Sequence, residues 1–494
     1  MYKVKFISVA VMLATATTAM AGGILTNTNQ SVEFLKNPAR DAAIGLDGVY
    51  SNPAGVVFMP EGFHLAINWQ YAHQTRTVRS TNPLFALGKK NDGKTSKTFE
   101  GIADAPFIPS VQAAYNTGNW SIQFNFSIPG GGGVCEFEKG LGSFESAVGM
   151  IAKQLEPLGA QGYDVDAYMR GRQYYFGFQL GAAYKINEHL SVYGGLRALY
   201  GNASYKARLS NIQVNTQGGY VNFDTFLNNA VSNINKQLGQ AELATQMGVY
   251  TQEQYAAAKA KADAALEQLD PLQKYSVGVN LMSNQTGIGI APVIGVDYKV
   301  GAFNFAVKYE FNTQMKMKNN STLEKAMEVE AVNKFQDGTK VDEDAPALLT
   351  VGAQWSVIPS VRVNAGYHHY FDTKANWYNH SEKLLDGDTN EYLAGAEWDI
   401  NEKFNISAGG QITRYQLTDD YMNDMSFVVN SYSFGFGVSY KPTKNIKVTA
   451  AYFQTNYEDY DKVTMADPAT KATIVGDSFT RTNRVLGLGA EFTF

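Results

Sequence analysis

The stretch 37-NPARDAAIGLDGVYSNPAGVVFMP-60 carries two Asn-Pro-Ala triplets fifteen residues apart. Pro38 and Pro53 lack a backbone donor and keep the preceding asparagines out of the helical region, while the glycines in this stretch permit sharp reversals. The pattern predicts a compact segment without strands. Because residues 63–494 instead read as a long series of alternating apolar and polar strands, we expect the strands to enclose this segment.

The alternation has a period of two residues. In 361–372, one face carries Val361, Val363, Ala365, Tyr367 and Phe371, and the other carries Arg362, Asn364, Gly366, His368 and Asp372. Residues 303–312 repeat this pattern, with Lys308 and Glu310 on the polar face. A charge facing lipid at mid-bilayer costs roughly 2 to 4 kcal/mol, so both charges should point into a lumen. A soluble β-sandwich also alternates, but its strands usually have only about 5 to 6 residues.

The number of strands follows from the turns. Short turns recur at 116–119, 186–189, 299–302, 358–360, 400–403 and 442–445. Six hairpins give twelve strands, and the runs 63–78 and 482–494 make fourteen. Long connections alternate with the short ones, at 79–108, 129–171, 207–274, 318–345, 375–390, 418–430 and 461–481. We therefore predict an all-β fold, a 14-stranded antiparallel transmembrane β-barrel over 62–494, with extracellular long loops and periplasmic termini.

The amino terminus and the composition agree with a bacterial outer-membrane protein. Residues 1–21 have a basic end, an apolar run and an Ala-Met-Ala site, which predicts a cleaved signal peptide. The chain has 29 Tyr and 28 Phe, as aromatic girdles require. Its single cysteine, Cys135, excludes a disulfide within the chain, and a net charge of -5 with mixed signs argues against nucleic acid as a partner.

The forty residues 22–61 precede the first predicted strand. A barrel of about eight strands is filled by its side chains and one of 16 to 18 leaves a channel, so a bore of fourteen strands is either open or plugged. Residues 22–61 are too apolar for a free tail, since they contain Ile24, Leu25, Val32, Phe34, Leu35, Ile44, Leu46, Val56, Val57 and Phe58. We expect them to form a hatch inside the lumen.

Three of the long loops carry helical patterns. One apolar stripe comprises Phe223, Phe226, Leu227, Ala230, Val231, Ile234 and Leu238 and ends at Gly239. Thr251 with Gln254 forms a capping-box pattern before a second helix in the same loop. Phe144 begins another stripe, and Ser321 with Glu324 is expected to open a further helix. The stripes are expected to pack on one another as a cap over the barrel mouth. In a second, compatible interpretation they also line an apolar groove that binds ligand.

The third strand, 120–128, is followed by Pro129 and four glycines. Proline cannot donate to a ladder and glycine weakens pairing, so hydrogen bonding to a neighbouring strand should break near Pro129, Gly130 and Gly131. Two interpretations remain open. The strand simply ends at the extracellular rim, or the break opens a lateral gate in the wall.

Together these features resemble the FadL/TodX family of outer-membrane transporters for hydrophobic compounds. Asn52-Pro53-Ala54-Gly55, after Val49-Tyr50-Ser51, is similar to the hatch motif of that family, and Asn37-Pro38-Ala39 is an additional copy. The resemblance implies a substrate pocket between extracellular loops, a hatch that rearranges, and a sideways exit at a kinked third strand. The alternating carboxyl terminus, which ends in Phe492 and Phe494, resembles the signal read by the barrel-assembly machinery.

The predicted function is passive transport of hydrophobic small molecules, such as fatty acids or aromatic compounds, by a monomer without cofactor or metal. Outer-membrane lipid and lipopolysaccharide are its expected surroundings. A general porin for polar solutes is the alternative. An outer-membrane barrel enzyme is a further alternative, but the six histidines show no Ser-His-Asp arrangement that the strand register would bring together. We therefore do not expect an enzyme.

Overall fold

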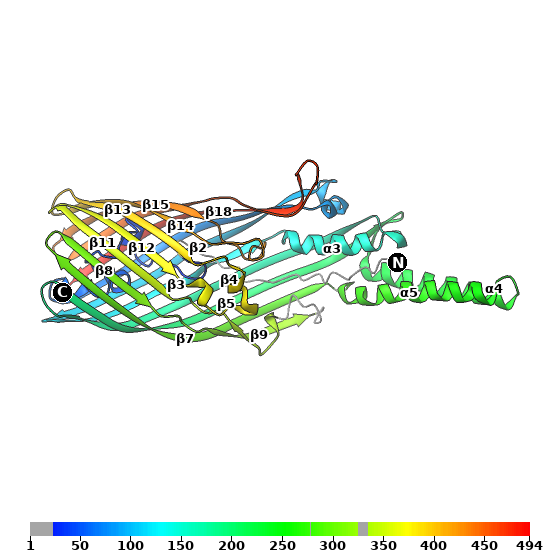
Figure 1. Cartoon of the computed structure of the whole chain (residues 1–494), viewed down its shortest axis with the longest axis horizontal. Coiled ribbons are helices and arrows are strands. Elements are labelled where there is room, and N and C mark those ends of the chain that lie inside the picture. The colour runs from blue at the N-terminus through cyan, green and yellow to red at the C-terminus, as the bar shows by residue number, and fades with distance from the viewer. Residues whose placement is uncertain (1–22, 277, 325–333) are drawn as a thin grey trace.

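The computed structural model describes residues 23–276, 278–324 and 334–494, and these form one closed antiparallel sheet with helices at one end (Figure 1). The predicted signal peptide lies outside the described residues. None of the helices in these three ranges has the length and apolar character needed to cross a membrane.

The sheet follows chain order and closes between its first and last strands. The strands are β1 (Gly62–Thr81), β2 (Ser96–Thr117), β3 (Trp120–Phe137), β4 (Gly162–Lys185), β5 (Leu190–Thr216), β6 (Gly219–Asn222), β7 (Val279–Val300), β8 (Phe303–Glu310), β9 (Lys316–Glu324), β10 (Lys340–Asp342), β11 (Leu348–Ile358), β12 (Val361–Tyr370), β13 (Thr389–Asp399), β14 (Phe404–Arg414), β15 (Ser431–Thr443), β16 (Ile446–Tyr457), β17 (Tyr460–Ala466) and β18 (Thr473–Thr493). Residues 64–81 of β1 pair with β18, so the sheet is a barrel without a free edge.

Several named strands are pieces of one wall element. β7 pairs with both β8 and β9, β18 pairs with both β16 and β17, and β10 and β11 pair with β9 and β8 respectively. β8 with β9, β10 with β11, and β16 with β17 therefore each count as one bent wall strand. β6 is a short hairpin arm on β5. Within the described residues the wall has fourteen strands, which confirms the predicted fold class.

Side chains alternate between the two faces of the wall as predicted. In β12, Asn364 and His368 are buried in the lumen, while Val363 and Ala365 are exposed on the outer face. In β8, Lys308 and Glu310 are only 3% and 8% exposed and point inward. The outer face is apolar, so burying it in hydrocarbon is favourable.

The strands β1 to β5 are longer than the sequence suggested. β2 begins at Ser96 and β4 at Gly162, inside the predicted loops 79–108 and 129–171, and β18 begins at Thr473, inside the predicted loop 461–481. These added parts carry fewer apolar residues, because they extend past the apolar band while still pairing with their neighbours. Hydropathy alone therefore made these strands too short.

The six predicted short turns lie at the end of the barrel that holds the carboxyl terminus, which we call the short-turn end (Figure 1). The opposite, long-loop end carries α3 (Gly142–Gln154) and a helical hairpin of α4 (Phe223–Gln246) and α5 (Gln252–Ser276) that projects along the barrel axis. α4 continues past Gly239, since a glycine can be tolerated within a helix at a cost of about 1 kcal/mol.

The predicted capping box is present at the start of α5. The Thr251 backbone N–H donates to Gln254 Oε1 over 2.8 Å, and the Gln254 N–H donates to Thr251 Oγ1 over 3.2 Å. The helix expected to open at Ser321 and Glu324 is wrong at its start, because both residues belong to β9, which pairs with β7. The rest of that predicted helix lies outside the described residues.

The amino-terminal segment lies inside the barrel. It contains α1 (Val32–Lys36), α2 (Gly48–Ser51) and a single 3₁₀ turn, η1 (Gly55–Phe58). Almost every residue from 23 to 57 is buried. We call residues 23–59 the plug.

Candidate functional site

Buried ion pairs attach the first half of the plug to the wall. Arg40 Nε lies 2.8 Å from Asp47 Oδ2 within the plug, and its Nη1 donates to Glu397 of β13. Arg362 of β12 also pairs with Glu397, over 3.3 Å. Two guanidiniums therefore share one wall carboxylate, and removal of that carboxylate would break the ion pair between Arg40 and the wall while Asp47 still pairs with Arg40.

The first Asn-Pro-Ala triplet fits against glycines of the wall. Asn37 Oδ1 accepts from the backbone N–H of Ala39 over 3.2 Å, which is an Asx turn. A Cβ atom at Gly395 would lie 2.0 Å from Asn37 Oδ1, and one at Gly409 would lie 2.8 Å from Pro38 Cδ. The wall is therefore shaped to let this triplet approach closely.

The second triplet bonds to the opposite side of the barrel. Asn52 Nδ2 donates to Asp297 of β7 over 2.6 Å, and Asn52 Oδ1 accepts from Gly55 N–H over 3.2 Å. The carbonyl oxygens of Pro53 and Ala54 accept from Gln123 and Ser191 over 2.8 and 2.7 Å. Both triplets thus combine a local turn with contacts to inward-facing polar side chains.

A histidine joins plug and wall between the two triplets. His368 Nε2 lies 2.9 Å from Asp41 of the plug, and its Nδ1 lies 2.9 Å from Glu391 of β13. His369, its neighbour, faces the other side of the strand. The adjacent pair therefore does not converge on one point, as the strand period requires.

Aromatic and basic groups meet at the centre of the lumen. Lys308 Nζ and the Arg197 guanidinium lie 4.6 and 5.0 Å from the centre of the Tyr50 ring, and both cations pair with Glu310. A cavity of about 20 Å³ beside this cluster, next to Pro129, has room for about one water. The plug therefore closes this part of the lumen.

The ladder between β2 and β3 is interrupted. Pairing holds from Val111–Phe126 toward the short turns and from Asp104–Val134 toward the long loops, and between these positions the register breaks. β3 does not end at Pro129, contrary to one of the two predicted alternatives, but continues to Phe137. Its pairing with β4 resumes at Gly130 and is irregular again at Gly131, which has a positive φ of 69°.

The plug takes the hydrogen bonds that β2 does not make. Asn27 N–H donates to Pro129 O over 2.8 Å, and its Nδ2 donates to Gly131 O over 2.8 Å. The Gln30 side chain accepts from Ile128 N–H over 3.0 Å and donates to Ile128 O over 3.2 Å. On the side where β2 is missing, the hydrogen bonds of the interrupted segment of β3 are therefore made by the plug.

Apolar contacts cross the wall at this interruption. A single cluster begins at Val32 and Leu35 of the plug and includes Ile108 of β2 and Ile128 of β3. Tyr174 and Phe176, which lie on the outward face of β4, pack against the same cluster. The interruption is thus bordered by apolar side chains from the lumen to the lipid face.

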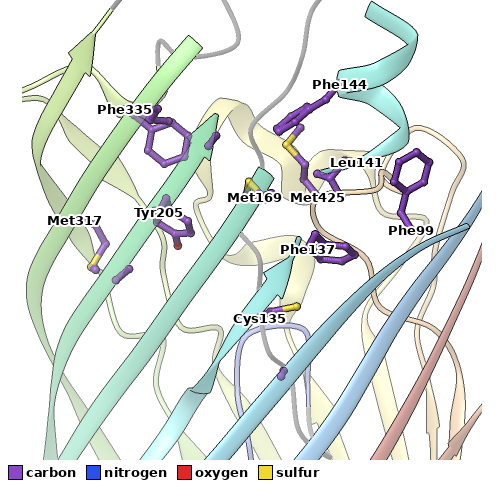
Figure 2. Close-up of a cluster of buried hydrophobic side chains, with 14 of the residues drawn as sticks. Phe99, Cys135, Phe137, Leu141, Phe144, Met169, Tyr205, Met317, Phe335 and Met425 are labelled. Carbon is purple, nitrogen blue, oxygen red and sulfur yellow. The ribbon is translucent and has the colours of Figure 1, made fainter. Parts of the chain in front are cut away.

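The lumen toward the long-loop end contains a large apolar cluster. Figure 2 shows a cluster rich in aromatic rings and sulfur atoms, drawn from several strands and from the loops, which we call the upper cluster: Phe99, Cys135, Phe137, Leu141, Phe144, Met169, Tyr205, Met317, Phe335 and Met425. Methionine side chains are flexible and polarizable, so such a surface can adapt to ligands of different shapes. Sequence analysis missed this cluster because its members come from distant strands and connections, and only the barrel register brings them together.

A pair of arginines lies near the upper cluster. Arg76 of β1 and Arg481 of β18 are directly opposite each other in the ladder, and both are buried in the lumen. Arg76 lies over the Phe427 ring at 4.6 Å, and Arg481 lies over the Tyr457 ring at 4.9 Å. This places two cations beside aromatic surface.

The predicted ligand stripe on α4 lies at the base of the hairpin. Phe223, Phe226 and Leu227 are buried against Leu155 and Val214, and Val231 and Ile234 pack beside them on the same cluster. Leu238 is half-buried farther along α4. The stripe joins the hairpin to the barrel mouth, and its role in ligand capture stays a prediction.

The carboxyl terminus completes the closing strand. Phe494 N–H donates to Phe63 O over 2.9 Å, and the rings of Phe63 and Phe494 lie 5.9 Å apart. The Phe492 and Phe494 rings stack at 6.5 Å. Their part in recognition by the assembly machinery stays a prediction.

The fold and the filled lumen define a plugged fourteen-stranded barrel with an apolar outer face. No protein-family model matches the chain, and no curated protein matches its sequence. Among solved structures, a FadL homologue of Pseudomonas aeruginosa is similar with a TM-score of 0.62 at 10% identity, over 96% of this chain and 100% of that one. The toluene transporters TodX of P. putida and TbuX of Ralstonia pickettii give TM-scores of 0.55 and 0.52, at 12% and 14% identity, over 91% and 94% of this chain and 94% and 99% of theirs. The chain therefore has the FadL fold.

Proposed function

We propose that this protein is an outer-membrane transporter that lets hydrophobic small molecules, such as fatty acids or aromatic compounds, pass without energy coupling. The observation that carries the proposal is the contrast within one lumen, where an apolar, sulfur-rich cluster rests on a plug held by polar bonds. An apolar ligand gains about 0.8 kcal/mol for each methylene removed from water, which favours its capture in the upper cluster.

In this proposal the long loops face the cell exterior, residues 1–21 are removed as a signal peptide, and both termini of the mature chain are periplasmic. The carboxyl-terminal residues Phe492 and Phe494 serve as the signal that the barrel-assembly machinery reads. The plug residues Asn37, Asn52 and Gly55 act as part of a hatch that rearranges when ligand arrives. Arg76 and Arg481 would stabilise an acidic head group where the ligand has one, since both carry a positive charge beside aromatic rings.

We further propose that the ligand leaves sideways, through the interruption between β2 and β3. The apolar contacts from Leu35 through Ile128 to Phe176 support this route, because an apolar ligand following them never has to enter water. A route along the plug would instead expose the ligand to Asp297, Glu397 and their partners, which no hydrocarbon can satisfy.

Two measurements on the purified protein test the function. In planar bilayers we expect almost no steady ion current, whereas a general porin would give large steady currents. In liposomes we expect tritiated oleate or toluene to be taken up faster than into protein-free vesicles, and a polar sugar to be excluded. Large currents with sugar uptake would replace the proposal with the porin alternative.

A further inference from the structure

Four cations face outward on neighbouring strands. They are Arg170 and Arg172 of β4 and Lys206 and Arg208 of β5, and we call them the basic patch. Arg170 is the direct ladder partner of Lys206, and Arg208 is the partner of Tyr168. Because alternate residues of a strand share a face, all four side chains lie on the outside of the barrel wall.

The groups around the basic patch only partly balance its charge. Arg172 Nη2 donates to Asn202 Oδ1 over 2.7 Å, and the Arg208 guanidinium lies 5.8 Å from the centre of the Tyr168 ring. Glu136, the outward neighbour of Arg170 on β3, accepts from the Tyr168 hydroxyl over 2.6 Å. Asp166, the outward residue of β4 that precedes Tyr168, also interacts with Arg208, although its carboxylate already accepts from Lys90 and Asn211. The four cations thus lie beside two carboxylates.

The patch lies on the long-loop side of an aromatic band, which it borders directly on β4. Toward the short-turn end, the next outward residues of β4 are Tyr174 and Phe176, and β5 presents Ser204 and Asn202 before Tyr200. Phe176 stacks with Tyr174 at 5.8 Å and with Tyr200 at 6.3 Å. Aromatic girdles mark the level at which the hydrocarbon of a membrane gives way to head groups. Arg172 and Arg170 therefore lie at head-group level, on the side of the long loops.

We propose that the basic patch binds the phosphate groups of the glycolipid that forms the outer leaflet, with the acyl chains of that lipid lying over Tyr174, Phe176 and Tyr200. Arginine forms bidentate, charge-assisted hydrogen bonds with phosphate, and two of the cations, Arg170 and Lys206, face each other across the ladder. A free phosphate ion would gain only the ionic contacts, whereas the lipid also gains the adjacent apolar contact. The assignment goes beyond transport and requires only that the long loops face the cell exterior.

Binding of lipid A to the full-length protein in detergent tests this assignment by native mass spectrometry. The wild-type protein should bind phosphorylated lipid A at least tenfold more tightly than the same lipid after enzymatic removal of its phosphates. The double variant R170Q/R172Q should lose affinity by about 25-fold, because each cation near an anionic lipid surface contributes about fivefold. The matched control K259Q/K261Q, on the exposed face of α5, should bind like wild type.

Three results would overturn the assignment. They are equal binding of phosphorylated and dephosphorylated lipid A, unchanged affinity of R170Q/R172Q, and complete competition by millimolar inorganic phosphate, which would indicate a site for the free ion. The comparison of the two lipids uses only wild-type protein, so it decides the question even where the variant does not insert. Transport of apolar ligand by R170Q/R172Q should equal wild type, which separates this site from the proposed function.

Discussion

The two halves of the lumen are filled in opposite ways. Near the short-turn end the plug meets the wall through carboxylates, guanidiniums and amides, as at Asp47, Asn52 and Glu397. Toward the long loops much of the filling consists of aromatic rings and methionines, as at Phe137, Met169 and Met425. Charged groups such as Arg76 and Arg481 are few there by comparison with this cluster and lie at its side. Directional bonds fix one arrangement, because each buried partner is expensive to leave unmade. Apolar packing accepts many partners of suitable size. The first half therefore suits a gate and the second suits a ligand.

Deletion of the plug, residues 23–59, should give the largest effect. Without it a fourteen-stranded wall encloses an open bore, so we expect steady ion currents in planar bilayers and loss of selectivity for apolar ligands. The control is a hairpin deletion, in which 224–275 is replaced by a short Gly-Ser linker. That variant keeps the plug and should give almost no ion current. A folded plug-deleted barrel without new current would show that these residues do not close the pore.

Glu397→Ala should weaken the attachment of the plug. It removes the ion pair between Arg40 and the wall while Asp47 still pairs with Arg40, so we expect a cost below the roughly 3 to 5 kcal/mol of leaving a buried charge without any partner. We expect flickering ion currents and faster protease cleavage within residues 23–59. Asp399→Asn is a matched control, because Asp399 pairs with Arg362 at a half-exposed site and should change stability by less than about 1 kcal/mol. Equal ion currents and equal cleavage rates in the two variants would show that the buried pair between Arg40 and Glu397 does not hold the plug in place.

Much of the barrel could be predicted from the sequence, because local sequence patterns determine it. The alternation in 303–312 and 361–372 specifies which face meets lipid, and the short turns count the hairpins. The extent of β2 and β4 could not be predicted, because their outer segments pair without facing hydrocarbon. The sequence also marked Ser321 as a helix start, although long-range pairing with β7 places it in a strand.

The contacts that fill the lumen were harder to predict from the sequence. The Asn-Pro-Ala triplets predicted a compact plug, but their partners, such as Asp297 and Glu397, lie hundreds of residues away and only the register brings them near. The upper cluster is assembled from five strands (β2, β3, β4, β5 and β9) and three connections between strands, so no local pattern contained it. Pro129 pointed to the interruption, yet the continuation of β3 to Phe137 depends on hydrogen bonds from Asn27 and Gln30.

Asp424 tests whether the upper half tolerates charge. Its carboxylate accepts from the Ser143 N–H at the start of α3 over 2.7 Å, beside Met425 of the upper cluster. Burial raises the pKa of Asp424 to about 6, with a smaller contribution from Asp477 of β18, against the opposing hydrogen bond from Ser143. Since the folded-state pKa is raised above the usual value near 3.9, the stability contribution is complete below about pH 4 and is lost as pH rises through 6.

Asp424→Asn keeps an oxygen acceptor and removes the titration. The variant should therefore be more stable than wild type at pH 8, by on the order of 2 kcal/mol, and equal to it at pH 4. Hydrogen exchange of the first turn of α3 at the two pH values measures this difference. A constant difference between wild type and variant across the range would show that Asp424 does not titrate in the way its burial implies.

The proposed lateral exit lies where the two halves meet, and one substitution tests it against the other routes. Replacement of Pro129 and Gly130 by valine, the direct way to restore pairing, is unsuitable because a Cβ at Gly130 would lie 2.5 Å from the Tyr175 ring and 2.8 Å from Leu25 O. Ile128→Asp instead places a charge in the apolar contacts between Leu35 and Phe176 and leaves the Gln30 hydrogen bonds to the backbone in place. Uptake of labelled oleate into liposomes should fall about tenfold, because even 1.4 kcal/mol against an apolar ligand at the exit has that effect. Ile128→Leu, which keeps volume and polarity, should transport like wild type, and both proteins should remain heat-modifiable on gels. Undiminished uptake by a folded Ile128→Asp barrel would mean that the ligand does not leave between β2 and β3.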